Sequence, residues 1–147
     1  MTDQNTSPVV YTIFCDDLRQ EVGNKVSYMG VYQGILYVEA FPVFLPKLCA
    51  AVTLRVLMDR RPKRLLFRML MEDTVIAERA FDTQLMAQDQ TAVDTNHDAI
   101  YATALFQFTP FAAEAPARLK SRVYFDDQEL KAGALNIRML PKAEGAV

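Results

Sequence analysis

The densest group of polar side chains in this chain lies near its amino terminus, in the segment C-D-D-L-R-Q-E. It contains the carboxylates Asp16, Asp17 and Glu21 and the guanidinium of Arg19. Paired carboxylates can supply general acid and base chemistry. In a short helical turn or a loop, Arg19 can also hold Asp16 or Glu21 in a two-pronged ion pair and fix the corner after the first strand. We take these four as the candidate binding residues and expect the arginine pair to be architectural.

A metal site is not expected from the ligands that the sequence offers. A second acidic group, Asp126, Asp127 and Glu129, could complete a calcium cage if its loop met the Asp16–Glu21 segment. Neither segment has the D-x-D-x-D spacing of a calcium loop, and aspartates at corners commonly bond to the backbone instead. One histidine and two separated cysteines cannot supply a standard zinc site. The sequence therefore predicts no metal and no cofactor.

Nucleophilic catalysis is equally poorly supported. The single histidine, His97, lies in the polar segment D-T-N-H-D, and the aspartates after Cys15 would raise a thiol pKa. The sequence contains no glycine-rich phosphate loop, no G-x-S-x-G elbow and no H-E-x-x-H motif. These observations favour a non-enzymatic protein. A small-molecule or metal-assisted enzyme that uses the loop carboxylates remains an alternative.

The charge of the chain gives no general attraction to polyanions. Its net charge is −2, and the one basic run is R-R-P-K-R at residues 60–64. No aromatic residues alternate with this run, and charges in a proline-containing turn also serve to discourage edge pairing. We therefore do not expect nucleic-acid binding as the primary role, but it stays an alternative. It would require residues 60–64 to share a face with Arg118, Lys120 and Arg122.

Composition and the two cysteines indicate a reducing compartment. No apolar run reaches the roughly 18 residues that span a bilayer, and the start M-T-D-Q-N-T-S-P does not resemble a signal peptide. We predict a cytoplasmic protein without a membrane partner. Cys15 and Cys49 both lie in apolar runs, so we predict free, buried and inaccessible thiols. A disulfide between them remains an alternative.

Alternation of apolar and polar residues predicts strands along most of the chain. The segment Asp16–Asn24 is predicted to contain one short helical turn, and the proline-rich segment Phe41–Pro46 is predicted to cross an end of the core. Gly133 is predicted to mark a bulge. The predicted strands cover residues 9–15, 25–32, 35–40, 48–58, 65–71, 75–81, 102–108, 119–125 and 135–139.

These elements predict an all-β protein: a single-domain antiparallel β-sandwich of roughly eight strands with at most one or two short helical turns. At 147 residues, 51% hydrophobic and 23% charged, the chain is long and apolar enough for one core. We place the sandwich domain at residues 8–140. Residues 1–7 are predicted to be disordered and residues 141–147 to form a flexible tail.

An aromatic cluster suggests an interface. Tyr28, Tyr32 and Tyr37 surround one glycine-containing turn, and Phe41 and Phe44 follow in the proline-rich segment. Together they could form an exposed patch for a protein partner or a second copy, although filling a sandwich core is an equally good explanation. Because a sandwich has open edges and this segment is hard to bury, we expect a homodimer.

Three segments give the chain a resemblance to known sequences: C-D-D-L-R-Q-E-V-G-N-K-V-S-Y-M-G-V-Y, F-P-V-F-L-P-K-L and R-V-Y-F-D-D-Q-E-L-K-A-G-A-L. Between Val10 and Met139 the chain resembles an uncharacterised family of small bacterial, partly phage-associated all-β proteins with the opening motif C-D-D-x-R-x-E-x-G-x-K. The resemblance implies an all-β fold in a prokaryotic cytoplasm and brings no catalytic residue. We therefore predict a non-enzymatic binding module whose partner is an unknown protein or a second copy.

Overall fold

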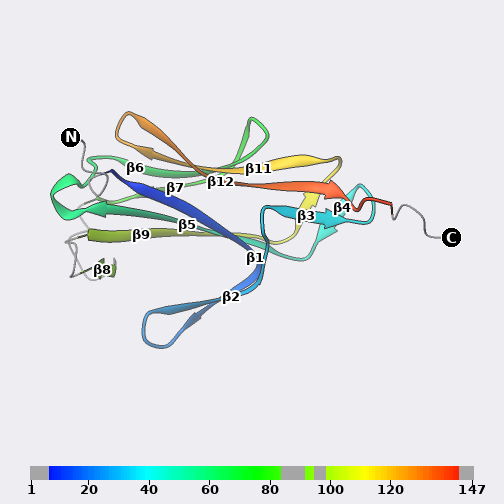
Figure 1. The fold of residues 1–147 in the computed structure, drawn as a ribbon, viewed down its shortest axis with the longest axis horizontal. Helices are drawn as coiled ribbons and strands as arrows, with labels where there is room; N and C mark the ends of the chain where they lie inside the picture. Colours follow the sequence, from blue (N-terminus) through cyan, green and yellow to red (C-terminus); the bar gives the residue numbers. More distant parts are fainter. Residues whose placement is uncertain (1–6, 84–91, 95–98, 143–147) are drawn as a thin grey trace.

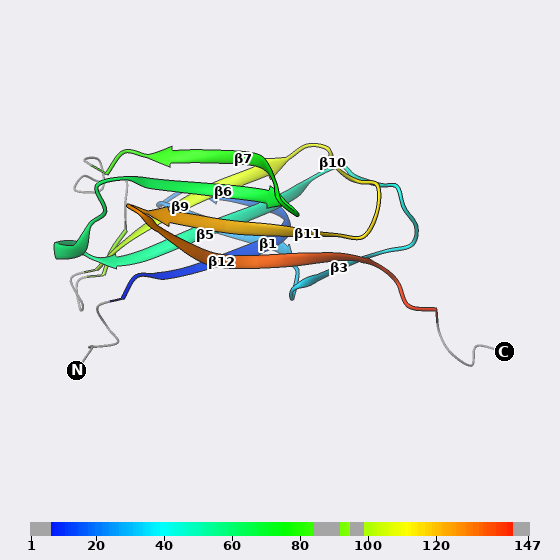
Figure 2. The same ribbon diagram turned by 90° about the horizontal axis from the view of Figure 1, so that it is seen from above.

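The computed structural model describes residues 7–83, 92–94 and 99–142 and confirms the all-β prediction. Two five-stranded sheets pack face to face as a sandwich, and Figures 1 and 2 show the two layers. The described residues contain a single short 3-10 turn, Met58–Arg60, at the basic run. Most of the predicted N-terminal segment and C-terminal tail lies outside the described residues, as does His97.

The first sheet is antiparallel throughout and contains the longest strands of the amino-terminal half. Its central strand is buried on both faces, which explains the nearly continuous apolar run L-C-A-A-V-T-L. In order across the sheet, the strands are β2 (Lys25–Val31), β1 (Val9–Glu21), β5 (Leu48–Leu57), β9 (Ala99–Phe108) and β8 (Ala92–Asp94).

The second sheet corrects the prediction of a purely antiparallel fold, because β3 runs parallel to β12. Local alternation cannot reveal this direction, since it reports only which residues of a strand are buried. In order, the strands are β3 (Ile35–Val38), β12 (Gln128–Met139), β11 (Ala117–Phe125), β6 (Leu65–Met71) and β7 (Thr74–Phe81).

The structure has more strands than the eight predicted: twelve occur in the described residues. One cause is the proline-rich segment, where Val43–Leu45 lies between Pro42 and Pro46 and forms β4. It pairs with β10 (Phe111–Ala113) in a separate two-stranded sheet. Proline has no backbone N–H to donate to a neighbouring strand. Because the two prolines flank β4 and do not lie within it, the strand keeps all of its N–H donors.

The predicted helical turn at residues 16–24 is wrong. β1 continues through the polar segment to Glu21 and pairs with β2 down to Lys25, so that the chain reverses only at residues 22–24. A strand that leaves the core needs no apolar alternation, because water covers both of its faces. Polar residues that look like a loop in the sequence therefore form half of a hairpin.

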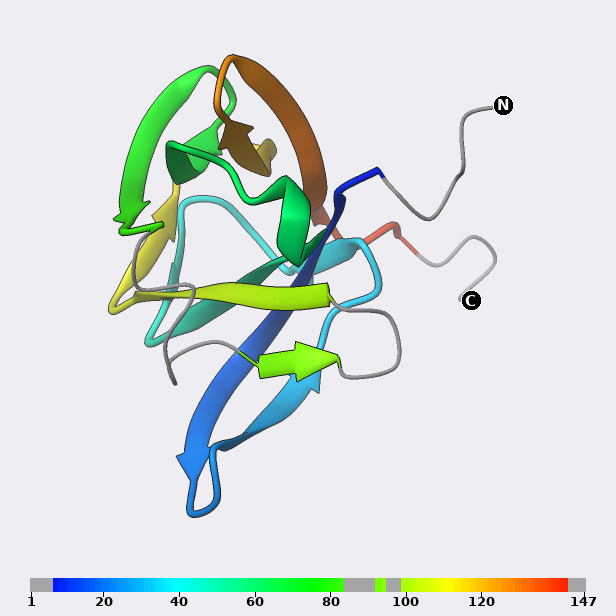
Figure 3. The same ribbon diagram turned by 90° about the vertical axis from the view of Figure 1, so that its left-hand side faces the viewer.

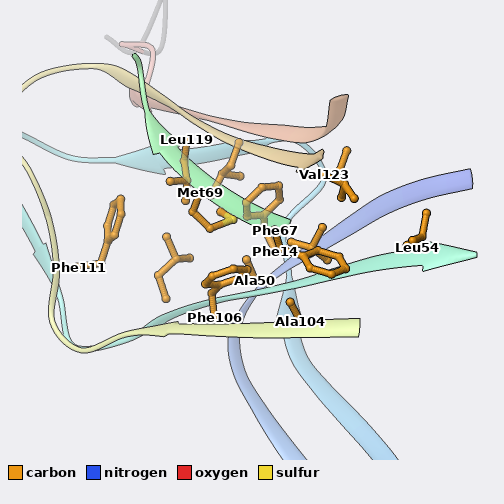
Figure 4. Packing of buried hydrophobic residues seen from close by; sticks show 14 of the residues in the cluster. Phe14, Ala50, Leu54, Phe67, Met69, Ala104, Phe106, Phe111, Leu119 and Val123 are labelled. Carbon is orange, nitrogen blue, oxygen red and sulfur yellow. The ribbon is translucent and has the colours of Figure 1, made fainter. Parts of the chain in front are cut away.

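The core lies between the two sheets. Figure 4 shows Ala50, Leu54 and Phe106 on the side of the first sheet and Phe67 and Leu119 on the side of the second. One polar contact crosses this apolar layer and joins β1 to β11: the Thr12 and Ser121 hydroxyls lie 2.6 Å apart.

The predicted bulge at Gly133 is confirmed. Ser121 pairs with Gly133 and Arg122 with Lys131, which leaves Ala132 as the extra residue of β12.

Candidate interaction site

The hairpin of β1 and β2 projects from the sandwich. β1 pairs with β5 only from Val9 to Cys15, and beyond Cys15 its one paired neighbour in the described chain is β2. We call residues 16–31 the arm. Figure 3 shows it extending away from both sheets, below the body of the protein. The candidate residues Asp16, Asp17, Arg19 and Glu21 therefore all lie on one projecting element.

The tip of the arm is a tight three-residue connection between Glu21 and Lys25. Gly23 and Asn24 both have positive φ, of 89° and 58°. Glycine adopts this backbone region without steric strain, and asparagine tolerates it better than most residues. The sequence V-G-N thus closes the hairpin and fixes the register of the arm.

The base of the arm is held by Asp16 and Tyr32. The Tyr32 hydroxyl donates a hydrogen bond to the Asp16 carboxylate, and the Tyr32 amide donates to the carbonyl of Phe14 at 2.8 Å. Burial, together with the hydrogen bond to Asp16, raises the pKa of the Tyr32 hydroxyl. Gly30 has a φ of 67°, and a Cβ there would overlap the Asp16 carboxylate. Gly30 is thus the residue that lets Asp16 reach Tyr32.

Asp17 connects the arm to the segment before β5. Its carboxylate accepts a hydrogen bond from Lys47 Nζ at 3.0 Å and one from the Leu18 amide at 2.9 Å. The contact with Lys47 lowers the pKa of the Asp17 carboxyl below its usual value. The pairing of β1 with β5 ends where Cys15 lies opposite Cys49. Two residues beyond this pair, the same antiparallel register places Asp17 opposite Lys47. Lys47 is the partner that the sequence-based reasoning missed.

We expect the Lys47 contact to give the protein a measurable pH dependence. The pKa of Asp17 is lower in the folded protein than in the unfolded chain, where it is about 3.9. The contribution of Asp17 to the stability of the fold is therefore complete above the unfolded pKa and is lost as the pH falls through the folded pKa. Lys47→Gln should therefore reduce the fall in unfolding free energy between about pH 5 and pH 2. Urea titrations of this variant, the wild type and the exposed control Lys142→Gln would measure it. If the unfolding free energy fell equally with pH in all three proteins, the contact between Lys47 and Asp17 would not stabilise the fold.

The predicted pair between Arg19 and Asp16 or Glu21 is not formed. Within the described residues Arg19 makes no ion pair, and it lies opposite Ser27 on the exposed part of the arm. For Asp16 the reason is geometric, because side chains alternate along a strand and Arg19 lies on the other face. Glu21 shares the face of Arg19, but the described residues contain no ion pair between the two. Glu21 lies at the tip opposite Lys25. The arm keeps its shape through Asp16 and Asp17, and Arg19 and Glu21 face solvent.

The arm also exposes apolar side chains and an open strand edge. Val22, Met29 and Val31 are 94%, 38% and 54% exposed. β2 is the last strand of its sheet, so its outer edge has no partner strand within the described residues. An exposed strand edge with apolar side chains is a template for pairing with another chain.

The five aromatic residues of the predicted interface differ in exposure. Tyr28 is half-buried on β2, and Tyr32 and Phe41 pack against the core. Tyr37 is exposed on β3. Phe44, which is 70% exposed on β4, lines a shallow hollow with Pro42 and residues 112–114.

Comparison with known proteins places the chain in a family. Residues 10–138 match a family of unknown function, DUF6941. The chain belongs to DUF6941. No curated protein and no solved structure matches it. The matched residues, 10–138, cover nearly the whole region between Val10 and Met139 in which the resemblance was expected. Because the family has no known function, the match assigns no activity to this DUF6941 member.

The acidic residues of the alternative calcium site lie apart in this DUF6941 chain. The arm and the turn between β11 and β12 lie on opposite sides of the molecule in Figures 1 and 3. Asp126 accepts hydrogen bonds from the Lys63 and Arg64 amides at 2.7 and 2.9 Å, so its carboxylate bonds to the backbone of a distant segment and not to that of its own turn. In the described part of the chain, no three His, Cys, Asp or Glu side chains form a group that could hold a metal ion.

The remaining alternatives receive no support from the geometry. Among the described residues, surface hollows are lined by residues 58, 59, 61–66 and 80–83 and by the β4–β10 segment. None of the four polar arm residues lines these hollows. On the outer face of the second sheet, Lys120 pairs with Asp73 at 3.4 Å and Arg122 with Glu129 at 3.5 Å. These cations are partly neutralised by the protein itself. In the described residues no helix is long and apolar enough to cross a membrane.

Proposed function

We propose that this chain is a non-enzymatic binding module that recognises a protein partner through the arm. The observation that carries the proposal is the open edge of β2 on a hairpin that has left the sandwich. A projecting hairpin contributes little to the core. Its exposed Met29 and Val31 side chains would be better covered by another chain than by water.

The backbone pattern supports strand addition as the mode of recognition. The Tyr32 amide bonds to Phe14 in β1. In an antiparallel pair, every second residue of a strand bonds to the partner strand, and the residues between turn their N–H and C=O groups the other way. The backbone groups that point outward from β2 are therefore those of Lys25, Ser27, Met29 and Val31. An extended partner segment could bond to these groups, and its side chains would contact Met29 and Val31.

The contacts at the base of the arm support the same role. Asp16 is bonded to Tyr32 and Asp17 to Lys47, so the arm is held in position before a partner arrives. Pre-organisation reduces the entropy that a binding element loses when it docks. In this proposal the acidic pair positions the arm, while β2 makes the contact.

Capture experiments with edge variants test the proposal. Ser27→Pro removes an outward N–H without removing a bond to β1, and Met29→Glu places a charge on the contact face. Each should weaken capture of the partner from a native-host lysate by about tenfold or more, with little change in melting temperature. Val75→Glu, on the exposed edge strand β7 of the other sheet, is the matched control. Equal capture by the wild type and all three variants would refute the proposal.

A second copy of the chain is the alternative occupant of the edge. A two-fold antiparallel pairing of β2 centred on Tyr28 would set Lys25 opposite Val31, so that no like charges meet. Light scattering at high micromolar concentration should then give twice the monomer mass of 16.6 kDa. The monomer mass would leave a different protein as the occupant.

The biological setting is part of the proposal. The resemblance described above supports a bacterial and partly phage-associated protein, and the two free thiols are in keeping with the cytoplasm. The domain is proposed to span residues 8–140, a range that contains the whole family match.

A further inference from the structure

The fold brings the two cysteines of the chain to one paired position. Cys15 of β1 lies directly opposite Cys49 of β5, although 34 positions separate them in the sequence. Opposite residues of an antiparallel pair share a face, with Cα atoms about 4.5–5.5 Å apart. A disulfide joins Cα atoms about 4.4–6.8 Å apart. The register thus offers a position at which a disulfide can form with little movement of the backbone.

The surroundings keep both groups as free thiols in the closed fold. Both side chains are fully buried. Burial, with a further contribution from Cys49, raises the pKa of Cys15 to about 11, and burial also raises the pKa of Cys49. Because the thiolate is the reactive form, neither cysteine should react quickly while covered.

The pair lies where the arm leaves the sandwich. Cys15 is the last residue of β1 that pairs with β5, and Asp16 begins the arm. The Cys49 thiol lies 4.0 Å from the carbonyl oxygen of Asp16, so the pair is in contact with the base of the arm. The pairing of β1 with β5 ends at Cys15. Local opening of this base would uncover the pair, because the end of a paired region opens more easily than its centre.

We propose that Cys15 and Cys49 form an oxidisable dithiol, which closes to an intramolecular disulfide when the base of the arm opens in the presence of a peroxide. The bond would join β1 to β5 and tie the arm to the sandwich. This inference rests on the register and burial of the cysteines and not on the proposed partner.

The reaction balances with peroxide as the oxidant. One thiol loses its proton, and its sulfur attacks the peroxide oxygen, which breaks the O–O bond and releases water with that proton. The second thiol then attacks the resulting sulfenic sulfur, which forms the S–S bond and releases a second water. Two thiols and one hydrogen peroxide therefore give one disulfide and two waters.

Intact-mass measurement on the full chain tests the pair. After treatment with hydrogen peroxide, formation of the disulfide should lower the mass of the protein by two hydrogen atoms. Both thiols should become unreactive toward a thiol reagent at the same time, and a reductant should restore both. Cys15→Ala and Cys49→Ala should each gain oxygen instead. Exposed methionines such as Met139 also take up oxygen, so peptide masses must locate the change. Oxygen gain at Cys15 or Cys49 of the wild type, an intermolecular dimer, or two unreacted thiols would each overturn the proposal.

A second variant tests the gating. Gly30→Ala disturbs Asp16 at the base of the arm, so it should speed formation of the disulfide roughly tenfold. Gly34→Ala, with a similar positive φ but no atom within 4 Å of the added methyl group, should react at nearly the wild-type rate. Equal rates in all three proteins would show that opening of the arm does not control the reaction.

Discussion

Replacement of Gly30 by alanine should destabilise the protein by about 2–4 kcal/mol. Two effects combine at this position. A side chain at a φ of 67° is strained, and the new Cβ occupies the space of the Asp16 carboxylate. Asp16 must then turn away and give up the hydrogen bond from Tyr32, a bond to a charged group. Urea denaturation would show the loss as a lower midpoint at an unchanged slope.

Gly34 provides the matched control for this prediction. Its φ of 86° is as unfavourable for alanine as that of Gly30, but nothing lies within 4 Å of the added Cβ. Gly34→Ala should therefore report the backbone strain alone, about 1–2 kcal/mol. The double variant Gly30→Ala with Asp16→Ala should lose less than the two single variants combined. Equal losses at Gly30 and Gly34, or simple additivity, would contradict the Asp16 contact.

The parts of the fold that the sequence predicted are those where at least one face of a strand is buried. β6 and β11 alternate between buried and outward-facing residues, and β5 is a nearly continuous apolar run. The predicted ranges of these strands and of β9 agree with the structure within a few residues. Burial leaves these patterns in the sequence because the core excludes polar side chains. The outer half of β1 leaves no such trace, since its residues from Asp16 to Glu21 lie beyond the sandwich.

The contacts of the candidate site follow the same logic. The polar cluster stands out in the sequence, but its contact partners are set by strand pairing. Lys47 meets Asp17 because β1 pairs with β5, and Gly30 meets Asp16 because β1 pairs with β2. Local spacing favours Arg19 as the partner of Asp16, but Arg19 lies on the other face of the strand from Asp16. Non-local register is the information that a single sequence does not display.

The largest loss of stability is expected from Phe67→Ala. Phe67 is fully buried at the centre of β6, between β11 and β7, and its ring lies 5.6 Å from that of Phe81, centroid to centroid. Removing the ring deletes buried apolar surface and leaves a cavity between the two sheets, at a cost of about 3–5 kcal/mol. Because domains of this size are stable by only about 5–15 kcal/mol, the variant should lose roughly a fifth or more of its stability.

Two controls determine whether this loss comes from packing at the core. Phe67→Leu keeps much of the volume and should lose clearly less than the alanine variant, about 1–2 kcal/mol. Phe44→Ala removes the same ring from a position that is 70% exposed and should change stability by less than about 0.5 kcal/mol. Urea midpoints of the three variants give the order directly. If Phe44→Ala were as damaging as Phe67→Ala, the core would extend to the β4–β10 end of the sandwich, and Phe44 could not be an exposed contact residue.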